Sequence, residues 1–156
     1  QMRNYGQKKK YHHSFLAWNR RMDTLQAAVL LVKLKYLDKW NKMRQDSAEI
    51  YRRQLSNLPV ILPVVAENRT HVYHQFVIRT KKRNRIQKYL ASKGISTGIH
   101  YPIPIHLQKA YKNLGHRIGD FPVSEQLSKE ILSLPMYPEL KEEQIKYISK
   151  KLGEVL

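Results

Sequence analysis

Three short segments carry more polar and aromatic side chains than a purely structural domain requires. They span residues 18–23, 98–106 and 132–138, and each lies where an expected helix or strand begins or ends. Binding and catalytic groups concentrate on such loops, because the elements beside them hold the loops in place while the polar groups stay exposed. These segments are therefore the first candidates for a functional site.

The first segment is suited to binding an anion. Asn19 and Arg21 come just before an expected helix, for which Asp23 is the N-cap residue. Free backbone N–H groups and the positive end of the helix dipole favour a negative charge at such a position. A phosphate contact is one interpretation of this pair, and ordinary helix capping beside a solvated arginine is the other.

The second segment offers imidazole and phenol groups. His100 and His106 are six residues apart across two prolines, and no Asp, Glu or Cys lies close by in the sequence to complete a zinc site. We therefore expect no metal. His100 and Tyr101 are compatible with substrate contact or acid–base chemistry, and equally with packing inside the loop. No Ser-His-Asp order, glycine-rich phosphate loop or carboxylate pair stands out.

Bulk composition limits the class of protein. A chain of 156 residues with 42% hydrophobic residues, ten tyrosines and two tryptophans is too apolar for a disordered tail and large enough for a core. It has no cysteine, which fits a reducing compartment, and we expect a cytoplasmic protein. No apolar run approaches the roughly 20 residues that cross a bilayer. Residues 1–10 lack the apolar part of a secretory signal.

The net charge is unusual and has two interpretations. The chain carries 29 Lys and Arg against 12 Asp and Glu, a formal charge of +17. Such an excess points to an acidic partner, either nucleic acid or a phosphorylated small molecule. The other interpretation is a solvated basic face that is balanced by an acidic part of a longer protein, and the absence of Met at position 1 favours a longer protein. A basic nucleic-acid-binding module, with its densest cluster at 81–85, therefore remains an alternative function.

Hydrophobic spacing predicts a small layer of helices on a mostly antiparallel sheet, a fold class between α/β and α+β. One or two long helices are expected over 23–55. Strands are expected at 60–65, 72–79 and 95–101. Shorter helices are expected at 83–92, 105–114, 124–132 and 141–152, with Gly94 as a left-handed helix end.

Five motifs occur together in one order: RNYG (3–6), NRRMDTLQAA (19–28), HYPIPIH (100–106), GDFPVSE (119–125) and LSLP (132–135). In combination they resemble the C-terminal part of the DegT/DnrJ/StrS-type sugar aminotransferases, which use pyridoxal 5'-phosphate and act on nucleotide-linked keto-sugars. The resemblance covers essentially the whole chain. It implies an aspartate aminotransferase type I fold and a homodimer with shared active sites.

The resemblance also implies a division of the chain and roles for five residues. Residues 1–22 would lie near the cofactor, 23–57 would form a long connecting helix, and 58–156 would form the small C-terminal domain. The resemblance implies that Asn19 reaches the cofactor phosphate from the neighbouring subunit and that Arg21 lies near the same pocket. For His100, Tyr101 and His106 it implies contact with the substrate.

Two features depart from the family's pattern. The lysine that binds the cofactor as a Schiff base belongs upstream of Arg3, so no catalytic residue is expected in this chain and the chain alone is expected to be inactive. Ala17 occupies a position where glycine is common. The complete enzyme would move an amino group from an amino acid, glutamate, to a keto-sugar in deoxyamino-sugar or cell-surface polysaccharide synthesis. A regulatory or structural relative without catalysis is the alternative within the family.

Overall fold

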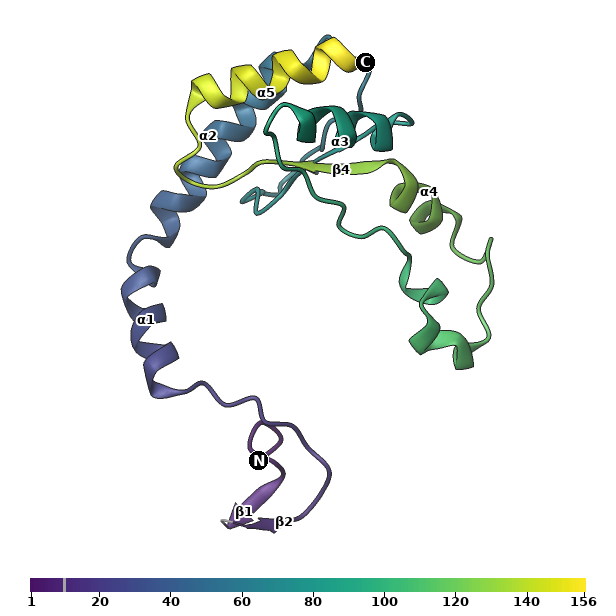
Figure 1. The fold of residues 1–156 in the computed structure, drawn as a ribbon. Coiled ribbons are helices and arrows are strands. Elements are labelled where there is room, and N and C mark those ends of the chain that lie inside the picture. Colours follow the sequence, from purple (N-terminus) through teal and green to yellow (C-terminus); the bar gives the residue numbers. More distant parts are fainter. Residues whose placement is uncertain (10) are drawn as a thin grey trace. The chain divides into compact units, whose positions relative to one another are not determined.

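The computed structural model describes residues 1–9 and 11–156, which divide into two units, Gln1–Asp38 and Lys39–Leu156 (Figure 1). The division lies inside the segment 23–57, which the family resemblance implies is a connecting helix. That segment contains two helices, α1 (Thr24–Leu34) and α2 (Leu37–Leu55), so the second of the two expected arrangements is present. No helix in the described part of the chain is long and apolar enough to cross a membrane.

The N-terminal unit consists of a small hairpin followed by α1. Strands β1 (Gln7–Lys9) and β2 (His12–His13) pair antiparallel, and the Ser14 N–H donates to the Gly6 carbonyl over 3.0 Å. This hairpin is not predicted from the sequence, because strands of two and three residues are too short to show alternation. Asp23 is the N-cap of α1, as predicted, and its N–H donates to the Gln26 side chain over 3.3 Å.

Gly6 is a position where the hairpin tolerates no side chain. Its φ is +67°, and a Cβ built on it would lie 2.2 Å from the Phe15 carbonyl oxygen. We expect Gly6→Ala to destabilise the hairpin by about 1–3 kcal/mol from backbone strain alone, and by more once the clash is added. Faster hydrogen exchange at the Ser14 amide would report the loss.

A matched control for Gly6→Ala is Gly94→Ala. Gly94 has a similar φ of +74°, but nothing lies within 4 Å of a Cβ built there. Its exchange reporter is the Ile95 amide, which donates to the Leu90 carbonyl over 2.9 Å. Equal losses of hydrogen-exchange protection in Gly6→Ala and Gly94→Ala would show that the clash with the Phe15 carbonyl adds nothing to the backbone strain.

The C-terminal unit is organised around two paired strands. β3 (Phe76–Arg79) runs antiparallel to β4 (Ile131–Leu134), with Phe76 opposite Leu134. The expected strands at 60–65 and 95–101 are each reduced to one bridge, from Ile61 to Arg79 and from Gly98 to Ser133. Pro63 removes an N–H group that a longer ladder in the first stretch would need. The expected strand at 72–79 is shortened to its last four residues.

β4 lies where the sequence predicts the end of a helix and the start of a loop. Helix α4 (Pro122–Glu130) stops before residues 131–134, which form the strand. Four residues give too little alternation to outweigh the helical spacing before them. The expected helix at 105–114 is instead two 3₁₀ segments, η1 (Ile105–Leu107) and η2 (Lys109–Leu114).

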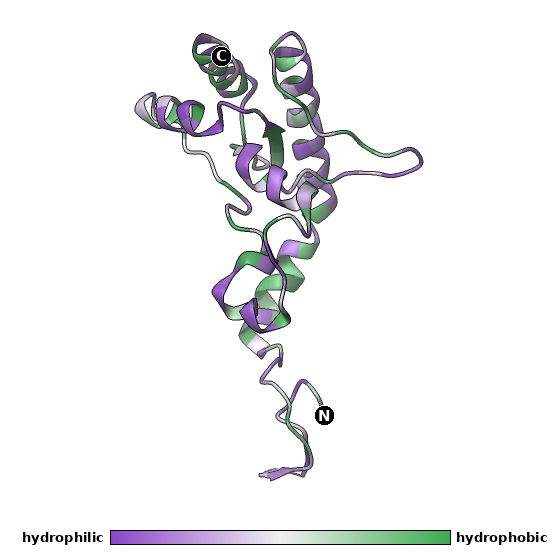
Figure 2. Ribbon diagram, turned by 90° about the vertical axis from the view of Figure 1, so that its right-hand side faces the viewer, coloured by the Kyte–Doolittle hydropathy of each residue, from purple (hydrophilic) through white to green (hydrophobic). Residues whose placement is uncertain are grey.

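Three helices supply the core of this unit together with the strands. They are α2, α3 (Arg83–Ser92) and α5 (Glu142–Val155), which gather beside β4 in Figure 1. α3 lies over the predicted residues, and Gly94 is left-handed, as predicted. Figure 2 shows that these helix ribbons carry both hydrophobic and hydrophilic stretches, as expected for helices with one buried face. The largest fully buried side chains are Tyr51, Leu55, Phe76, Ile78, Ile86, Leu90, Leu132, Ile145 and Leu152.

The two faces of the sheet have different surroundings. Leu132 and Leu134 of β4 point into the core. Because successive side chains of a strand point to opposite faces, Ile131 and Ser133 belong to the other face, with Val77 of β3. Ile131 and Val77 line a cavity on that side. The sheet therefore packs a core on one face and builds a candidate site on the other.

Candidate functional site

A cavity of about 580 Å³ in the C-terminal unit contains all three predicted substrate contacts. His100, Tyr101 and His106 line it together. The rest of the wall is mainly apolar and includes Val77, Ile103, Leu114, Phe121, Leu127 and Ile131. A mainly apolar hollow with a few convergent polar groups is the usual form of a small-molecule site.

His100 is held by residues of the sheet. Its Nδ1 lies 2.9 Å from Ser133 Oγ, and the backbones of Gly98 and Ser133 form a two-way bridge at 3.0 and 2.8 Å. A Cβ on Gly98 would lie 2.4 Å from Cε1 of the His100 ring, so the ring occupies the space that glycine leaves open. Two of the three segments selected from the sequence, 98–106 and 132–138, thus meet at this point.

We expect Gly98→Ala to displace the His100 ring from the cavity wall. The ring can rotate away from the new methyl group only by losing its hydrogen bond to Ser133, which is worth about 0.5–1.5 kcal/mol. The change should appear as a shift of the His100 ring signals by NMR and as a lower thermal stability. Ser133→Ala removes the same hydrogen bond without a clash and should shift the His100 signals similarly. Unaltered His100 signals in Gly98→Ala would show that the ring is positioned in another way.

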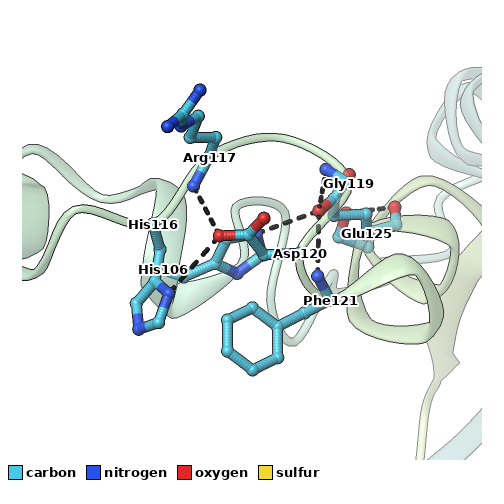
Figure 3. A network of polar contacts seen from close by, with 8 residues as sticks. His106, His116, Arg117, Gly119, Asp120, Phe121 and Glu125 are labelled. Carbon is cyan, nitrogen blue, oxygen red and sulfur yellow. Dashed lines mark hydrogen bonds and ion pairs between the residues drawn. The ribbon is translucent and has the colours of Figure 1, made fainter.

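His106 is paired with a carboxylate that sequence reasoning did not connect to it. Its Nε2 lies 3.0 Å from Oε1 of Glu125, which is 19 residues away in the chain, and both side chains are largely buried. The same oxygen accepts the N–H of Gly119 at 2.8 Å and that of Phe121 at 3.4 Å (Figure 3). The Gly119 N–H, the largest cause, and the His106 ring hold the pKa of Glu125 below its usual value, although burial opposes them.

A second histidine and carboxylate lie beside the first pair. His116 Nδ1 is 3.4 Å from Oδ2 of Asp120, and that oxygen also accepts the Arg117 N–H at 3.0 Å. The Arg117 N–H is the main cause of a lowered pKa of Asp120. The His106 and His116 rings both lie against Phe121, with centroids 4.7 and 5.0 Å from it. The motif at 119–125 was visible in the sequence, but its proximity to the two histidines was not.

The two predicted cofactor contacts lie in the N-terminal unit. Asn19 is exposed and forms an antiparallel bridge with Asn4. Arg21 lines a hollow of about 300 Å³, but Asn19 is not among the residues that line it. The hollow also contains Lys8, Lys9 and the amide side chains of Asn4 and Gln7. Three cationic side chains and two amides are a donor set suited to an anion such as phosphate. The five predicted site residues therefore form two sets, one in each unit.

Comparison with known proteins gives a match along nearly the whole chain. The family model described as the DegT/DnrJ/EryC1/StrS aminotransferase family matches residues 1–153. A protein of Geobacillus stearothermophilus named pleiotropic regulatory protein is 44% identical over 98% of this chain. A dTDP-3-amino-3,6-dideoxy-alpha-D-galactopyranose transaminase of Aneurinibacillus thermoaerophilus is 44% identical over 94% of it.

Solved structures agree with these matches. The crystal structure of DesV from S. venezuelae superposes with a TM-score of 0.90 at 38% identity over 98% of this chain. In each case the chain spans only about two fifths of the matched protein: 42% of the first relative, 40% of the second and 42% of DesV.

Proposed function

Because this chain belongs to the DegT/DnrJ/EryC1/StrS aminotransferase family, we propose that it is the C-terminal part of a pyridoxal-phosphate-dependent enzyme. The complete protein transfers an amino group from an amino acid, glutamate, to a nucleotide-linked keto-sugar. The observation that carries this proposal is the likeness, over nearly the whole chain, to a protein named as a transaminase of a nucleotide-linked sugar. The mainly apolar cavity with its three histidines supports a small-molecule substrate.

The N-terminal unit fits the phosphate of the cofactor. In this proposal the Asn19 amide donates a hydrogen bond to the phosphate, and Arg21 supplies a positive charge beside it. The hollow that Arg21 lines with Asn4, Lys8 and Lys9 supports the role of Arg21, because its cations suit a dianionic group. Pyridoxal phosphate supplies the electron sink for amino-group transfer when it is bound.

The C-terminal unit provides the contacts to the sugar. His100, Tyr101 and His106 bind and orient the substrate along the cavity wall, where the apolar residues exclude water from the bound ring. Ser133 fixes the position of His100 through the 2.9 Å contact to its Nδ1. Polar groups that are held in place before the substrate arrives lose little freedom when it binds, which favours both affinity and selectivity.

The proposal includes the fold and the assembly of the complete protein. We propose an aspartate aminotransferase type I fold, in which residues 1–22 approach the cofactor, 23–57 connect and 58–156 form the small domain. We also propose a cytoplasmic homodimer in which the neighbouring subunit supplies Asn19. The side chains of Leu30, Leu34 and Leu37 are exposed. Apolar patches of this kind seldom remain bare, so their exposure supports a further protein surface that packs against them.

The test is amino transfer by the complete protein. Purified protein is mixed with pyridoxal phosphate, glutamate and a panel of dTDP- and UDP-linked keto-sugars, and the amino sugar is detected by mass spectrometry. Appearance of an amino sugar with equimolar 2-oxoglutarate supports the proposal. Absence of product with every member of the panel, from protein that binds the cofactor, contradicts it.

A regulatory role is the second candidate, and one observation favours it. The relative from Geobacillus stearothermophilus is named as a regulatory protein and is as similar to this chain as the transaminase is. The presence or absence of the cofactor-binding lysine in the complete protein decides between the catalytic and the regulatory role, because only the enzyme needs that lysine. The nucleic-acid alternative rests on charge alone, and salt-dependent DNA binding at physiological ionic strength would support it.

A further inference from the structure

One carboxylate oxygen in the C-terminal unit collects three hydrogen bonds. Oε1 of Glu125 contacts His106 Nε2 at 3.0 Å, Gly119 N at 2.8 Å and Phe121 N at 3.4 Å (Figure 3). Glu125 is buried, with 8% of its surface exposed. Two of its donors are backbone groups of the loop that precedes α4, and the third is a ring that lines the cavity. Glu125 therefore links the loop to the cavity wall.

The two backbone contacts determine the chemical state of Glu125. An N–H group can only donate, so Gly119 and Phe121 require an acceptor at Oε1. These contacts keep the pKa of Glu125 low, and the side chain is a carboxylate at neutral pH. A carboxylate has no proton to give, and the His106 nitrogen that faces it must therefore be the donor.

The tautomer of the neutral His106 ring follows from this requirement. A neutral imidazole carries one proton, and the hydrogen bond made by one ring nitrogen selects which nitrogen carries it. With the proton on Nε2, Nδ1 keeps its lone pair and can accept a hydrogen bond. His106 lines the cavity, so Nδ1 is the ring nitrogen left for a ligand.

We propose that Glu125 is a positioning residue that holds His106 as its Nε2–H tautomer, so that Nδ1 accepts a hydrogen bond from a sugar hydroxyl in the cavity. This inference rests on the proposed function for the identity of the ligand, but not for the tautomer. A hydroxyl donor fits Nδ1, whereas a ligand that offers only acceptors, such as a phosphate oxygen, does not.

Asp120 provides a matched control. It is a second carboxylate that contacts a histidine lining the same cavity, but its side chain bonds to His116 and to the Arg117 N–H. If any carboxylate near the cavity had the same influence, Asp120→Asn would affect the His106 tautomer as strongly as removal of the Glu125 acceptor in Glu125→Leu. The contacts predict that only Glu125→Leu changes the tautomer.

The first measurement is ¹⁵N NMR of the 156-residue chain with labelled histidine, at a pH where the His106 ring is neutral. Wild-type His106 should show a protonated Nε2 and an unprotonated Nδ1. Glu125→Leu removes the acceptor, and the population with the proton on Nδ1 should rise several-fold. Glu125→Gln keeps an oxygen that must face the two backbone donors, so His106 should stay in the Nε2–H form there. Asp120→Asn should leave the His106 tautomer unchanged.

Two results would overturn the assignment. One is a wild-type His106 ring with its proton on Nδ1. This measurement does not depend on the folding of any variant. The other is an unchanged tautomer in Glu125→Leu, which has no acceptor for the ring. Should that variant fail to fold, Glu125→Asp retains the charge but withdraws the oxygen by one methylene, and an unchanged His106 tautomer there would count equally against the proposal.

The second measurement concerns the sugar in the complete protein. Losing a neutral hydrogen bond to a hydroxyl should raise KM for the keto-sugar about three- to tenfold in Glu125→Leu, with a smaller change in kcat and none in cofactor affinity. If wild-type His106 has its proton on Nε2 but the variant without the Glu125 acceptor has an unaltered KM, Nδ1 does not contact the sugar. If the tautomer behaves as expected but the wild-type complete protein transfers no amino group, the proposed function fails while the role of Glu125 in positioning His106 stands.

Discussion

The 156 residues alone are expected to show no transaminase turnover, whatever cofactor and substrates are added. The reaction needs a lysine whose unprotonated amine is held at the aldehyde carbon of the cofactor. Every lysine that the structure describes is exposed except Lys151. Lys151 contacts Glu154 at 2.8 Å, which raises the pKa of its amine and makes it less reactive at neutral pH. No described lysine is therefore activated.

Borohydride trapping followed by mass spectrometry tests this expectation. With pyridoxal phosphate present, modification should be weak and spread over many exposed lysines, without amino transfer from glutamate to a keto-sugar. The positive control is the complete protein under the same conditions, which should be modified at one lysine outside these 156 residues. Stoichiometric modification of a single lysine within this chain, with turnover, would contradict the expectation.

Asn19→Ala in the complete protein should weaken cofactor binding strongly. A hydrogen bond to a charged group is worth about 1.5–3 kcal/mol, so the dissociation constant for pyridoxal phosphate should rise roughly 10- to 150-fold. The preference among keto-sugars should change much less, because Asn19 and the sugar contacts have separate roles in the proposal. Equilibrium dialysis of the cofactor and relative kcat/KM values for two sugars measure the two effects.

The control for Asn19→Ala is Asn57→Ala. Asn57 is also exposed, but it lies in the C-terminal unit after α2 and has no proposed ligand. Its replacement should leave cofactor affinity unchanged. If Asn19→Ala behaves in the same way, Asn19 has only the structural role that its bridge to Asn4 provides.

The longer, strongly patterned elements could be predicted from the sequence. α3 matches its predicted residues, and α5 begins within one residue of the predicted start, because both present regular apolar spacing. Gly94 ends α3 in the left-handed region, which glycine enters without steric cost. These features depend on local chemistry, which is contained in short stretches of sequence.

Elements that depend on distant partners could not be predicted. β4 is a strand because β3 pairs with it from more than fifty residues away, and its four residues carry little signal of their own. The site shows the same limit. His106 was identified as a candidate, but its partner Glu125 lies 19 residues later, and only the folded loop brings the two within 3.0 Å.

Ser133 connects the candidate site to the correctness of folding. It stands between Leu132 and Leu134, which fill the core, and its own hydroxyl holds His100 on the opposite face. A slip of β4 by one residue against β3 would turn the serine toward the apolar core and present a leucine to His100. Molecules with a misaligned β4 would therefore lose the contact between Ser133 and His100 together with the correct packing of the core. Titration with a tightly bound sugar ligand should consequently count only the correctly folded molecules in a preparation.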